Sequence, residues 1–417
     1  MRVAVVPVLN PANGGTYQYS WNVLTVLRAW AARHEGSVVL APERHAMEGV
    51  QPEELAGWEV LDLRGRFALS GFLARVRRKL GGPPDPDRPY RDPQVNRILR
   101  DAGVDLVLCL YPSEVGFTSG LPFAMAIHDL QHRLNPQFPE VSADGEAGYR
   151  EYVHRNGIRE ARRILVQDDV GKQDVLTFYG EFGVRPERVM ILPFLPPSYL
   201  PAEVGEDEVD RVREAYGLPD AYVFCPAHFW PHKNHLRLVE ALSVLHAQRL
   251  DVPLVLSGSH GGALRTRTLD EVMRRARERG IADRVRYLGY APDADMAGLY
   301  AGAAALVFPT FFGPASIPIL EAWQLGCPVL TSDIRGIREQ VGDAGILVDP
   351  GSVPAIAEGI RRLWTEPDLR RTIAGAGRAR LGRYTWADFE SRVVSVLERL
   401  RAEFEDGPDG CSGGGPG

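Results

Sequence analysis

The chain has 417 residues, of which 24% are charged and 45% hydrophobic, and it carries a formal net charge of −6. This composition excludes wholesale disorder, and the length suggests two or three domains that each bury a core. The acidic balance excludes a general nucleic-acid binder, and no apolar run reaches the ~18 residues that a membrane helix needs.

The N-terminus and the cysteines suggest a cytoplasmic protein. Residues 1–15 pass from a short apolar run to polar residues without a small-residue cleavage site, which predicts a first strand and not a signal peptide. The cysteines are too few and too scattered for a disulfide framework or a CxxC zinc site: Cys109, Cys225, Cys327 and Cys411. We therefore expect a reducing compartment.

Short β-branched runs alternate with longer amphipathic stretches along the chain. The predicted strands are 2–8, 37–42, 58–63, 104–110, 123–129, 162–168, 189–194, 222–227, 253–259, 284–290, 304–310, 327–333 and 345–350. The predicted helices are 20–33, 146–161, 169–180, 235–249, 267–280, 316–325 and 354–364. Continuous apolar strands that alternate with helices predict α/β, doubly wound parallel sheets covered on both faces.

A proline-rich stretch divides the chain. Residues 193–208 contain four prolines and then an acidic run, which argues against a regular element there. We expect an N-terminal Rossmann-like domain over 1–197 and a second over 198–385, facing each other across a cleft. A terminal helix over 386–405 would pack back on the first domain, and 406–417 would be a flexible tail.

The first candidate motif follows the first predicted strand. Gly14 and Gly15 lack a Cβ, so the backbone can bend sharply there and approach a ligand. A helix that begins near Thr16 would present its N-terminal amides to a phosphate or a sugar oxygen. The GxGxxG pattern of a dinucleotide site is absent, and a plain strand-to-helix turn is the alternative.

The second motif lies at the end of the predicted strand 123–129. His128 and Asp129 stand at the carboxyl edge, where open α/β sheets bind ligands. His128 could donate to a sugar hydroxyl or transfer a proton near pH 7. Asp129 could orient His128 or cap the next turn, and a purely structural histidine is the alternative.

The third motif is the loop after the strand 222–227. Only three of the 48 basic residues are lysines, and Lys233 is one of them. Its ammonium group suits a diphosphate, and His228 brackets the same loop. Asn234 is a candidate cap for the following helix. The clustered histidines lack a suitably spaced carboxylate or cysteine, so we expect no zinc.

The fourth motif covers residues 308–332. Ser316 is a candidate N-cap, Pro318 lies in the first turn and Gly326 is a natural stop, so a helix should begin beside the preceding Gly-Pro turn. Its free amides could hold a phosphate. Glu321, just over one turn into the helix, could bind a ribose diol or interact favourably with the helix dipole.

Two further stretches allow alternatives. Residues 64–82 interleave arginines with large apolar residues, which fits a packed surface helix or a peripheral contact with an anionic membrane face. The Asp85/Asp87 and Asp293/Asp295 pairs do not end a strand, so a magnesium–diphosphate site is not expected. P-loop, GxSxG and HExxH motifs are also absent.

Together, these motifs resemble retaining GT-B glycosyltransferases of the large family 4, over nearly the whole chain. The segments that carry the resemblance are the Gly14–Gly15 turn, His128–Asp129, VQDDVGKQDVLTFYG, HFWPHKNHLRLVEAL, RVRYLGYAPDADMAGLYAGAAALVFPT, ILEAWQLGCPVLTS, GIREQVGDAGILVDPGS and RYTWADFESRVVSVLERL. The last segment resembles the family's terminal helix.

The resemblance implies site residues. Lys233 matches the lysine on the donor diphosphate, Glu321 the glutamate on the ribose, His128 the histidine beside the transferred sugar and Gly15 the loop glycine near the diphosphate. Two positions depart from the pattern, because the family's first glutamate falls at Gly313 and its arginine at His228. The full set of expected donor contacts is Gly14, Gly15, His228, Gly258, Tyr290, Gly313, Ser316, Ile317 and Pro318.

The expected activity is transfer of mannose or another hexose from a nucleotide-diphosphate sugar, with retention and without a metal or other cofactor. The acceptor would be a glycan, a lipid-linked compound or a small molecule. A nucleotide-sugar epimerase and a non-catalytic nucleotide-sugar binder are the alternatives. A glycan phosphorylase is less suited to a chain with so few lysines for a pyridoxal anchor.

Overall fold

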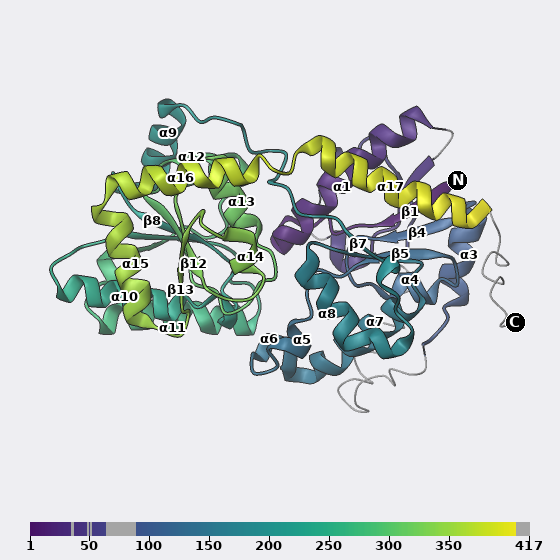
Figure 1. Ribbon diagram of the computed structural model, residues 1–417, viewed down its shortest axis with the longest axis horizontal. Coiled ribbons are helices and arrows are strands. Elements are labelled where there is room, and N and C mark those ends of the chain that lie inside the picture. The colour runs from purple at the N-terminus through teal and green to yellow at the C-terminus, as the bar shows by residue number, and fades with distance from the viewer. Residues whose placement is uncertain (35–36, 48–49, 51, 64–88, 406–417) are drawn as a thin grey trace, which may run out of the picture. The chain divides into compact units, whose positions relative to one another are not determined.

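The computed structural model describes residues 1–34, 37–47, 50, 52–63 and 89–405. The predicted fold class is confirmed, because the chain forms two compact α/β units, each around a parallel sheet (Figure 1). One unit contains 1–136, 141–193 and the chain from Trp386 onward. The other contains 137–140 and 194–385. The change of unit at 193/194 lies within the proline-rich stretch.

The first unit has a seven-stranded sheet in the order β3-β2-β1-β4-β5-β6-β7, with every neighbouring pair parallel. Its strands are β1 (Arg2–Val6), β2 (Ser37–Leu40), β3 (Glu59–Val60), β4 (Leu106–Cys109), β5 (Phe123–Ala126), β6 (Arg163–Val166) and β7 (Val189–Ile191). Its described α-helices are α1 (Gly15–Arg33), α3 (Pro93–Asp101), α4 (Glu114–Thr118), α5 (Gln131–Leu134), α7 (Glu146–Glu160), α8 (Asp169–Tyr179) and α17 (Trp386–Glu405). A short helix, α6 (Pro139–Ser142), contains the change of unit at 140/141.

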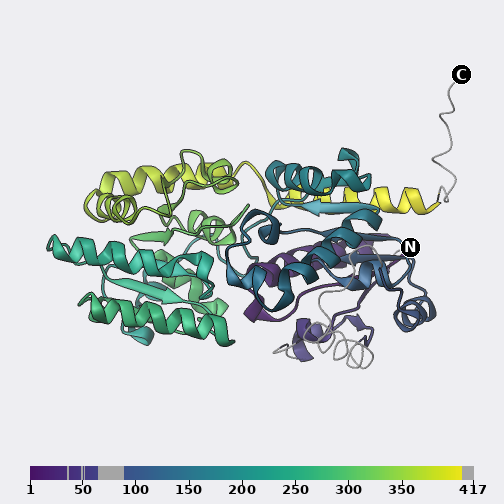
Figure 2. The ribbon, with the colours of Figure 1, turned by 90° about the horizontal axis from the view of Figure 1, so that it is seen from below.

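The second unit has a six-stranded parallel sheet in the order β10-β9-β8-β11-β12-β13. Its strands are β8 (Val223–Pro226), β9 (Leu254–Ser257), β10 (Val285–Tyr287), β11 (Ala305–Phe308), β12 (Val329–Ser332) and β13 (Ile346–Val348). Its helices are α9 (Glu206–Tyr216), α10 (His235–Ala247), α11 (Ala263–Glu278), α12 (Asp293–Ala301), α13 (Ile317–Gln324), α14 (Ile337–Val341), α15 (Val353–Thr365) and α16 (Pro367–Leu381). Helices cover both faces of this sheet (Figures 1 and 2).

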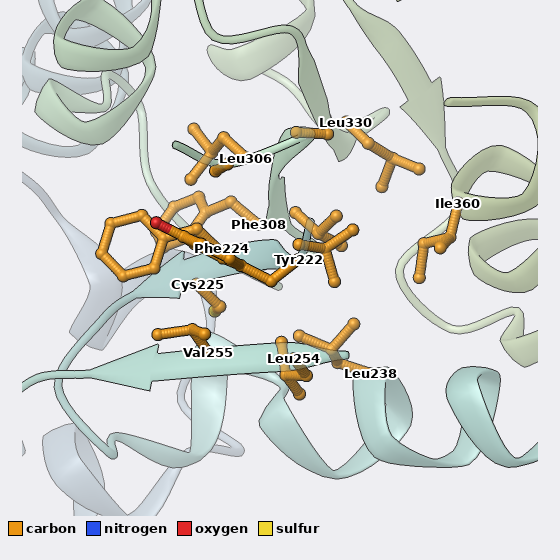
Figure 3. Close-up of a cluster of buried hydrophobic side chains, with 14 of the residues drawn as sticks. Tyr222, Phe224, Cys225, Leu238, Leu254, Val255, Leu306, Phe308, Leu330 and Ile360 are labelled. Atoms are coloured by element: carbon orange, nitrogen blue, oxygen red, sulfur yellow. The ribbon is translucent and has the colours of Figure 1, made fainter. Parts of the chain in front are cut away.

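The core of the second unit explains why its strands are apolar on both faces. Side chains of β8, β9, β11 and β12 meet Leu238 of α10 and Ile360 of α15 in one buried cluster (Figure 3). A parallel sheet that is covered on both sides buries both faces of its inner strands, so a continuous apolar run is the expected sequence there. The sheet thereby becomes a rigid platform for the loops at its carboxyl edge.

The terminal helix α17 is part of the first unit and runs beside α1 (Figure 1). Ion pairs fix it there, from Glu390 to Arg33 of α1 and from Glu403 to Arg163 of β6. None of the helices within the described ranges is long and apolar enough to cross a membrane. The basic stretch 64–82 and the tail 406–417 lie outside the described residues.

All thirteen predicted strands are present, although each is shorter than its apolar run. Among the described helices, the sequence analysis did not predict α3, α4, α5, α6, α9, α12, α14 and α16. The irregular stretch predicted over 193–208 overlaps the start of α9, since Glu206, Asp207 and Glu208 occupy the first turn of this helix, where the helix dipole favours carboxylates. In this segment the acidic run marks a helix N-terminus and not a solvated connection.

Candidate functional site

Each sheet has one position where the direction of strand order reverses. In the second unit it lies between β8 and β11, which are direct neighbours. In the first unit it lies between β1 and β4. Loops diverge at such a position and leave a crevice at the carboxyl edge, the usual ligand site of open α/β sheets. The third and fourth motifs follow β8 and β11, and the first motif follows β1.

Hydrogen bonds join the Lys233 loop directly to the loop after β11. The carbonyl of His232 accepts from the backbone N–H of Phe311 at 2.7 Å and from the hydroxyl of Thr310 at 3.2 Å. The Lys233 ammonium lies 4.9 Å from the ring centroid of Phe308, the last residue of β11. Lys233 is therefore held at the start of the turn that leads to Ser316.

Asn234 does not have the predicted capping role. It stands before α10 in a left-handed conformation, with φ of 66°, and its side chain makes no cap bond. Its amide nitrogen instead donates to the carbonyls of Pro309 and Pro350, each at 2.8 Å. Asn234 thus ties together the loops that follow β8, β11 and β13.

His228 lies near two cations and is neutral at pH 7. Burial and, to a smaller extent, the positive charges of Arg265 and Lys233 together lower its pKa to about 4. Its Nδ1 accepts from the backbone N–H of Ser259 at 3.0 Å, so the remaining proton is on Nε2. This histidine adds no charge to the loop.

Gly258 makes this contact possible. Its φ is +144°, and a Cβ at this position would lie 2.3 Å from the carbonyl oxygen of Ala227 and 2.9 Å from the nitrogen of His228. The loop after β9 can therefore approach the loop after β8 only through a glycine. Gly258 was predicted as a donor contact, and the structure shows it positioning the loop that carries Ser259.

The N-terminus of α13 is fixed by Gln340, and the Ser316 hydroxyl there does not take part in this contact. The amide of Gln340 bonds both the N–H and the carbonyl of Ser316, each at 2.9 Å. Ser316 stands at the N-cap, but its side chain does not cap the helix, and its buried Oγ has no hydrogen-bond partner among the described residues. Pro318 lies in the first turn as predicted, which leaves the backbone N–H groups of Ile317 and Ile319 there. This end of α13 has the hydroxyl and amides that an anion requires.

Gly313 adopts φ of +155°, a conformation that favours glycine. Only the carbonyl of Ala315 and the side chain of Ile337 would lie near an added Cβ, both at 3.9 Å. The backbone conformation, and not lack of space, thus distinguishes this turn from one that carries a glutamate at position 313.

Glu321 is buried and already accepts hydrogen bonds from two tyrosines. The hydroxyl of Tyr300 donates at 2.5 Å, and that of Tyr199 lies 3.5 Å from the other carboxylate oxygen. Burial and the neighbouring carboxylate raise the pKa of Tyr300 well above its ordinary value, so Tyr300 remains a donor. The two tyrosines orient the carboxylate.

The remaining predictions in the second unit concern Tyr290 and metals. Tyr290 is 44% exposed in the loop between β10 and α12. Asp295 accepts from Tyr216 at 2.6 Å and pairs with Arg211 at 2.7 Å, which gives it a structural role. Within the described ranges, no three His, Cys, Asp or Glu side chains are grouped closely enough to hold a metal ion.

In the first unit, α1 begins at Gly15, one residue before the predicted start. Gly14 precedes it with φ of 54°, and no side chain caps this end. Tyr19, one turn into α1, lies edge-on to the ring of His128 with the centroids 4.9 Å apart. The first and second motifs are therefore neighbours within this unit.

Both ring nitrogens of His128 are engaged. Nε2 donates to the carbonyl of Leu110, after β4, at 2.8 Å, and Gln167 lies 3.0 Å from Nδ1. Burial lowers the pKa of His128, so the ring is neutral at pH 7 and Nδ1 accepts from the Gln167 amide. A doubly protonated ring would suit the reversed amide, whose nitrogen would donate to Ile127 and His128 carbonyls. A contact between this ring and a sugar stays a prediction, and it requires one of these bonds to open.

Asp129 caps the next turn and does not orient His128. Its Oδ1 accepts from the N–H of Gln131 at 2.9 Å and from Arg150 at 3.0 Å. The charge of Arg150 and these bonds outweigh burial and hold the pKa of Asp129 far below its ordinary range. Of the two roles considered for Asp129, the structure supports the cap.

Sequence reasoning missed the residues that fix the site from a distance. Gln340, Ser259, Tyr300 and Gln167 each contact a predicted residue through the fold, and no motif marks them. Gly336 offers the only local signal, because a Cβ there would lie 2.5 Å from the carbonyl of Pro314 in the turn before α13. A glycine between a strand and a short helix is consistent with such a close approach.

Comparison with known proteins agrees with this arrangement. The model of the family described as glycosyl transferases group 1 matches residues 207–380, which lie within the second unit. The O-antigen chain mannosyltransferase B of Escherichia coli is 29% identical over 266 residues, which cover 63% of this chain and 67% of that protein. A serotype-specific mannosyltransferase of Escherichia coli is 23% identical over 275 residues, and the match spans about one third of its length.

Solved structures extend the likeness to nearly the whole chain. The Anabaena protein HepE, in complex with UDP and glucose, superposes with a TM-score of 0.71 over 95% of this chain and 99% of its own, at 18% identity. At that identity the likeness establishes the fold. Residues 207–380 therefore form a glycosyl transferases group 1 domain, and the chain is a glycosyltransferase of the GT-B fold.

Proposed function

We propose that this glycosyltransferase transfers a sugar, mannose or another hexose, from a nucleoside-diphosphate donor with net retention, in the manner of family 4. The observation that carries the proposal is the set of groups at the strand-order reversal of the second unit. Lys233 is held at the start of the turn before α13, and α13 opens with an unpartnered buried hydroxyl and free amides. Such groups bind phosphate.

In this proposal the diphosphate is the leaving group. The bond between the anomeric carbon and the phosphate oxygen breaks, the acceptor hydroxyl forms a new bond on the same face, and its proton passes to the departing phosphate. Lys233 and the α13 amides stabilise the negative charge that develops, and they need no reorganisation to do so. Glu321 holds the ribose hydroxyls. The Gly14–Gly15 turn and His128 serve the sugar and the acceptor.

The relatives support a class of donor and a class of acceptor. The mannosyltransferase relatives support mannose and a glycan or lipid-linked acceptor. The HepE complex supports a nucleotide sugar as donor. The proposed reaction uses no metal, because fixed cations and amides take over charge neutralisation.

The test is release of nucleotide from a panel of UDP-, GDP-, ADP- and dTDP-sugars, with EDTA present and a lipid or glycan extract as acceptor. We expect release from one donor, and NMR of the product should show the anomeric configuration of that donor. Interconversion of the sugar without an acceptor would favour an epimerase. Binding of a donor without release, in every extract, would favour a non-catalytic binder.

A further inference from the structure

The arginine that the family pattern pairs with Lys233 is replaced by His228 in this chain. A nucleoside diphosphate presents several negative charges, and enzymes commonly neutralise such groups with clamps of Arg and Lys. His228 is neutral at pH 7, because burial and the neighbouring positive charges lower its pKa to about 4, and His232 already pairs with Glu140. A second cation must therefore come from another element if the site is to neutralise a diphosphate.

Arg265 is placed for this role. It belongs to the first turn of α11, directly after β9, and its positive charge acts on His228 together with that of Lys233. Its guanidinium carbon lies 4.8 Å from the ring centroid of Trp230, which is in the same loop as Lys233. Its Nε donates to the carbonyl of Gly261 at 2.6 Å. The stacking and this bond fix the guanidinium while leaving its two terminal nitrogens for a ligand.

The charge of Arg265 is not neutralised by any carboxylate that the structure describes. No carboxylate within the described ranges pairs with Arg265, and burial alone accounts for its lowered pKa. By contrast, Arg274 and Arg275, further along the same helix, pair with Glu271, Glu278 and Glu240. Partial burial of a cation without a counter-charge is costly, which is consistent with a site that an anion completes.

We propose that Arg265 is the second cation of the donor site and bonds the diphosphate together with Lys233, in the role that an arginine at position 228 would otherwise have. This inference rests on the proposed function and adds a substrate contact to it. Arg265 would also make the loop after β9 part of the diphosphate site, with Gly258 and Ser259 setting its position against His228.

The test compares Arg265→Gln with Arg267→Gln, an exposed arginine two residues along α11. UDP, GDP, ADP and dTDP are first titrated to the wild-type protein. The diphosphate that binds most tightly is then titrated to each variant, and binding of the corresponding nucleoside is followed by ligand-observed NMR. We expect Arg265→Gln to weaken diphosphate binding by about 10- to 100-fold and to leave the nucleoside unchanged. Arg267→Gln should stay within about twofold of wild type.

A second variant tests the compensation. His228→Arg in the Arg265→Gln background should recover at least about tenfold of the lost affinity, because it restores a cation beside Lys233. Thermal unfolding of each variant shows whether it is folded. If the double variant does not fold, the comparison of Arg265→Gln with Arg267→Gln still decides whether Arg265 binds the diphosphate.

The possible results distinguish failure of this inference from failure of the proposed function on which it rests. If Lys233→Ala weakens diphosphate binding and Arg265→Gln behaves like Arg267→Gln, Arg265 is not a phosphate ligand. Equal losses for diphosphate and nucleoside would give Arg265 a structural role in its loop and would overturn the inference too. Failure of the wild-type protein to bind any of the four diphosphates would overturn the proposed function, and this inference with it.

Discussion

Replacing Lys233 by alanine is expected to lower kcat/KM for the donor by at least about 100-fold, mainly through kcat. The ammonium group is fixed beside Phe308 and next to the turn before α13, where negative charge develops as the diphosphate leaves. A charge placed at the leaving group stabilises the transition state more than the bound substrate. Steady-state nucleotide release with the donor identified by the panel measures this effect.

The chain provides a matched control for Lys233. Lys172 lies on α8 of the first unit, it is not among the predicted site residues, and it is one of the other two lysines. Lys172→Ala should keep turnover within about twofold of wild type. Turnover of Lys233→Ala near that of Lys172→Ala would show that the diphosphate does not bind at this loop.

Replacing Glu321 by glutamine is expected to weaken donor binding by about 10- to 100-fold. The substitution keeps the volume of the side chain and one of the two acceptor oxygens that face Tyr300 and Tyr199, but it removes the charge that accepts from ribose hydroxyls. Titration with a nucleoside diphosphate and its 2′-deoxy analogue separates this role from packing. Wild type should discriminate between the two ligands, and Glu321→Gln should not.

Glu358→Gln serves as the control for this substitution. Glu358 pairs with Arg361 on the exposed side of α15, so its loss should leave both titrations unchanged. Thermal unfolding should show Glu321→Gln to be folded. If Glu321→Gln still discriminates against the 2′-deoxy ligand as wild type does, Glu321 is a structural residue and the ribose binds elsewhere.

The sequence predicts the fold class well because parallel sheets need continuous apolar strands, and nothing else in the chain has that pattern. Amphipathic helices were harder to predict from the sequence. Helix α9 begins after several prolines with three acidic residues, and local pattern alone does not distinguish it from a linker. Its assignment depends on packing against α12, which a linear reading does not include.

The candidate site likewise contains residues that the sequence identifies and residues that only the fold brings to it. Lys233 and Glu321 stand in motifs whose spacing can be read directly. The role of Asn234 was predicted wrongly, because its side chain donates to two distant carbonyls and makes no cap bond to α10. Gln340 and Arg265 reach the site only through the fold, from helices that follow other strands. Residue type and spacing identify the groups that could do chemistry, and tertiary contacts decide which groups hold them in place.

The most direct test of the central claim is a crystal structure of the protein with the nucleoside diphosphate that the panel selects. We predict that phosphate oxygens lie within hydrogen-bond distance of the Lys233 ammonium and of Oγ of Ser316, with the ribose hydroxyls on Glu321. A nucleotide whose phosphates face solvent, or one bound away from the β8–β11 edge of the second unit, would contradict the account.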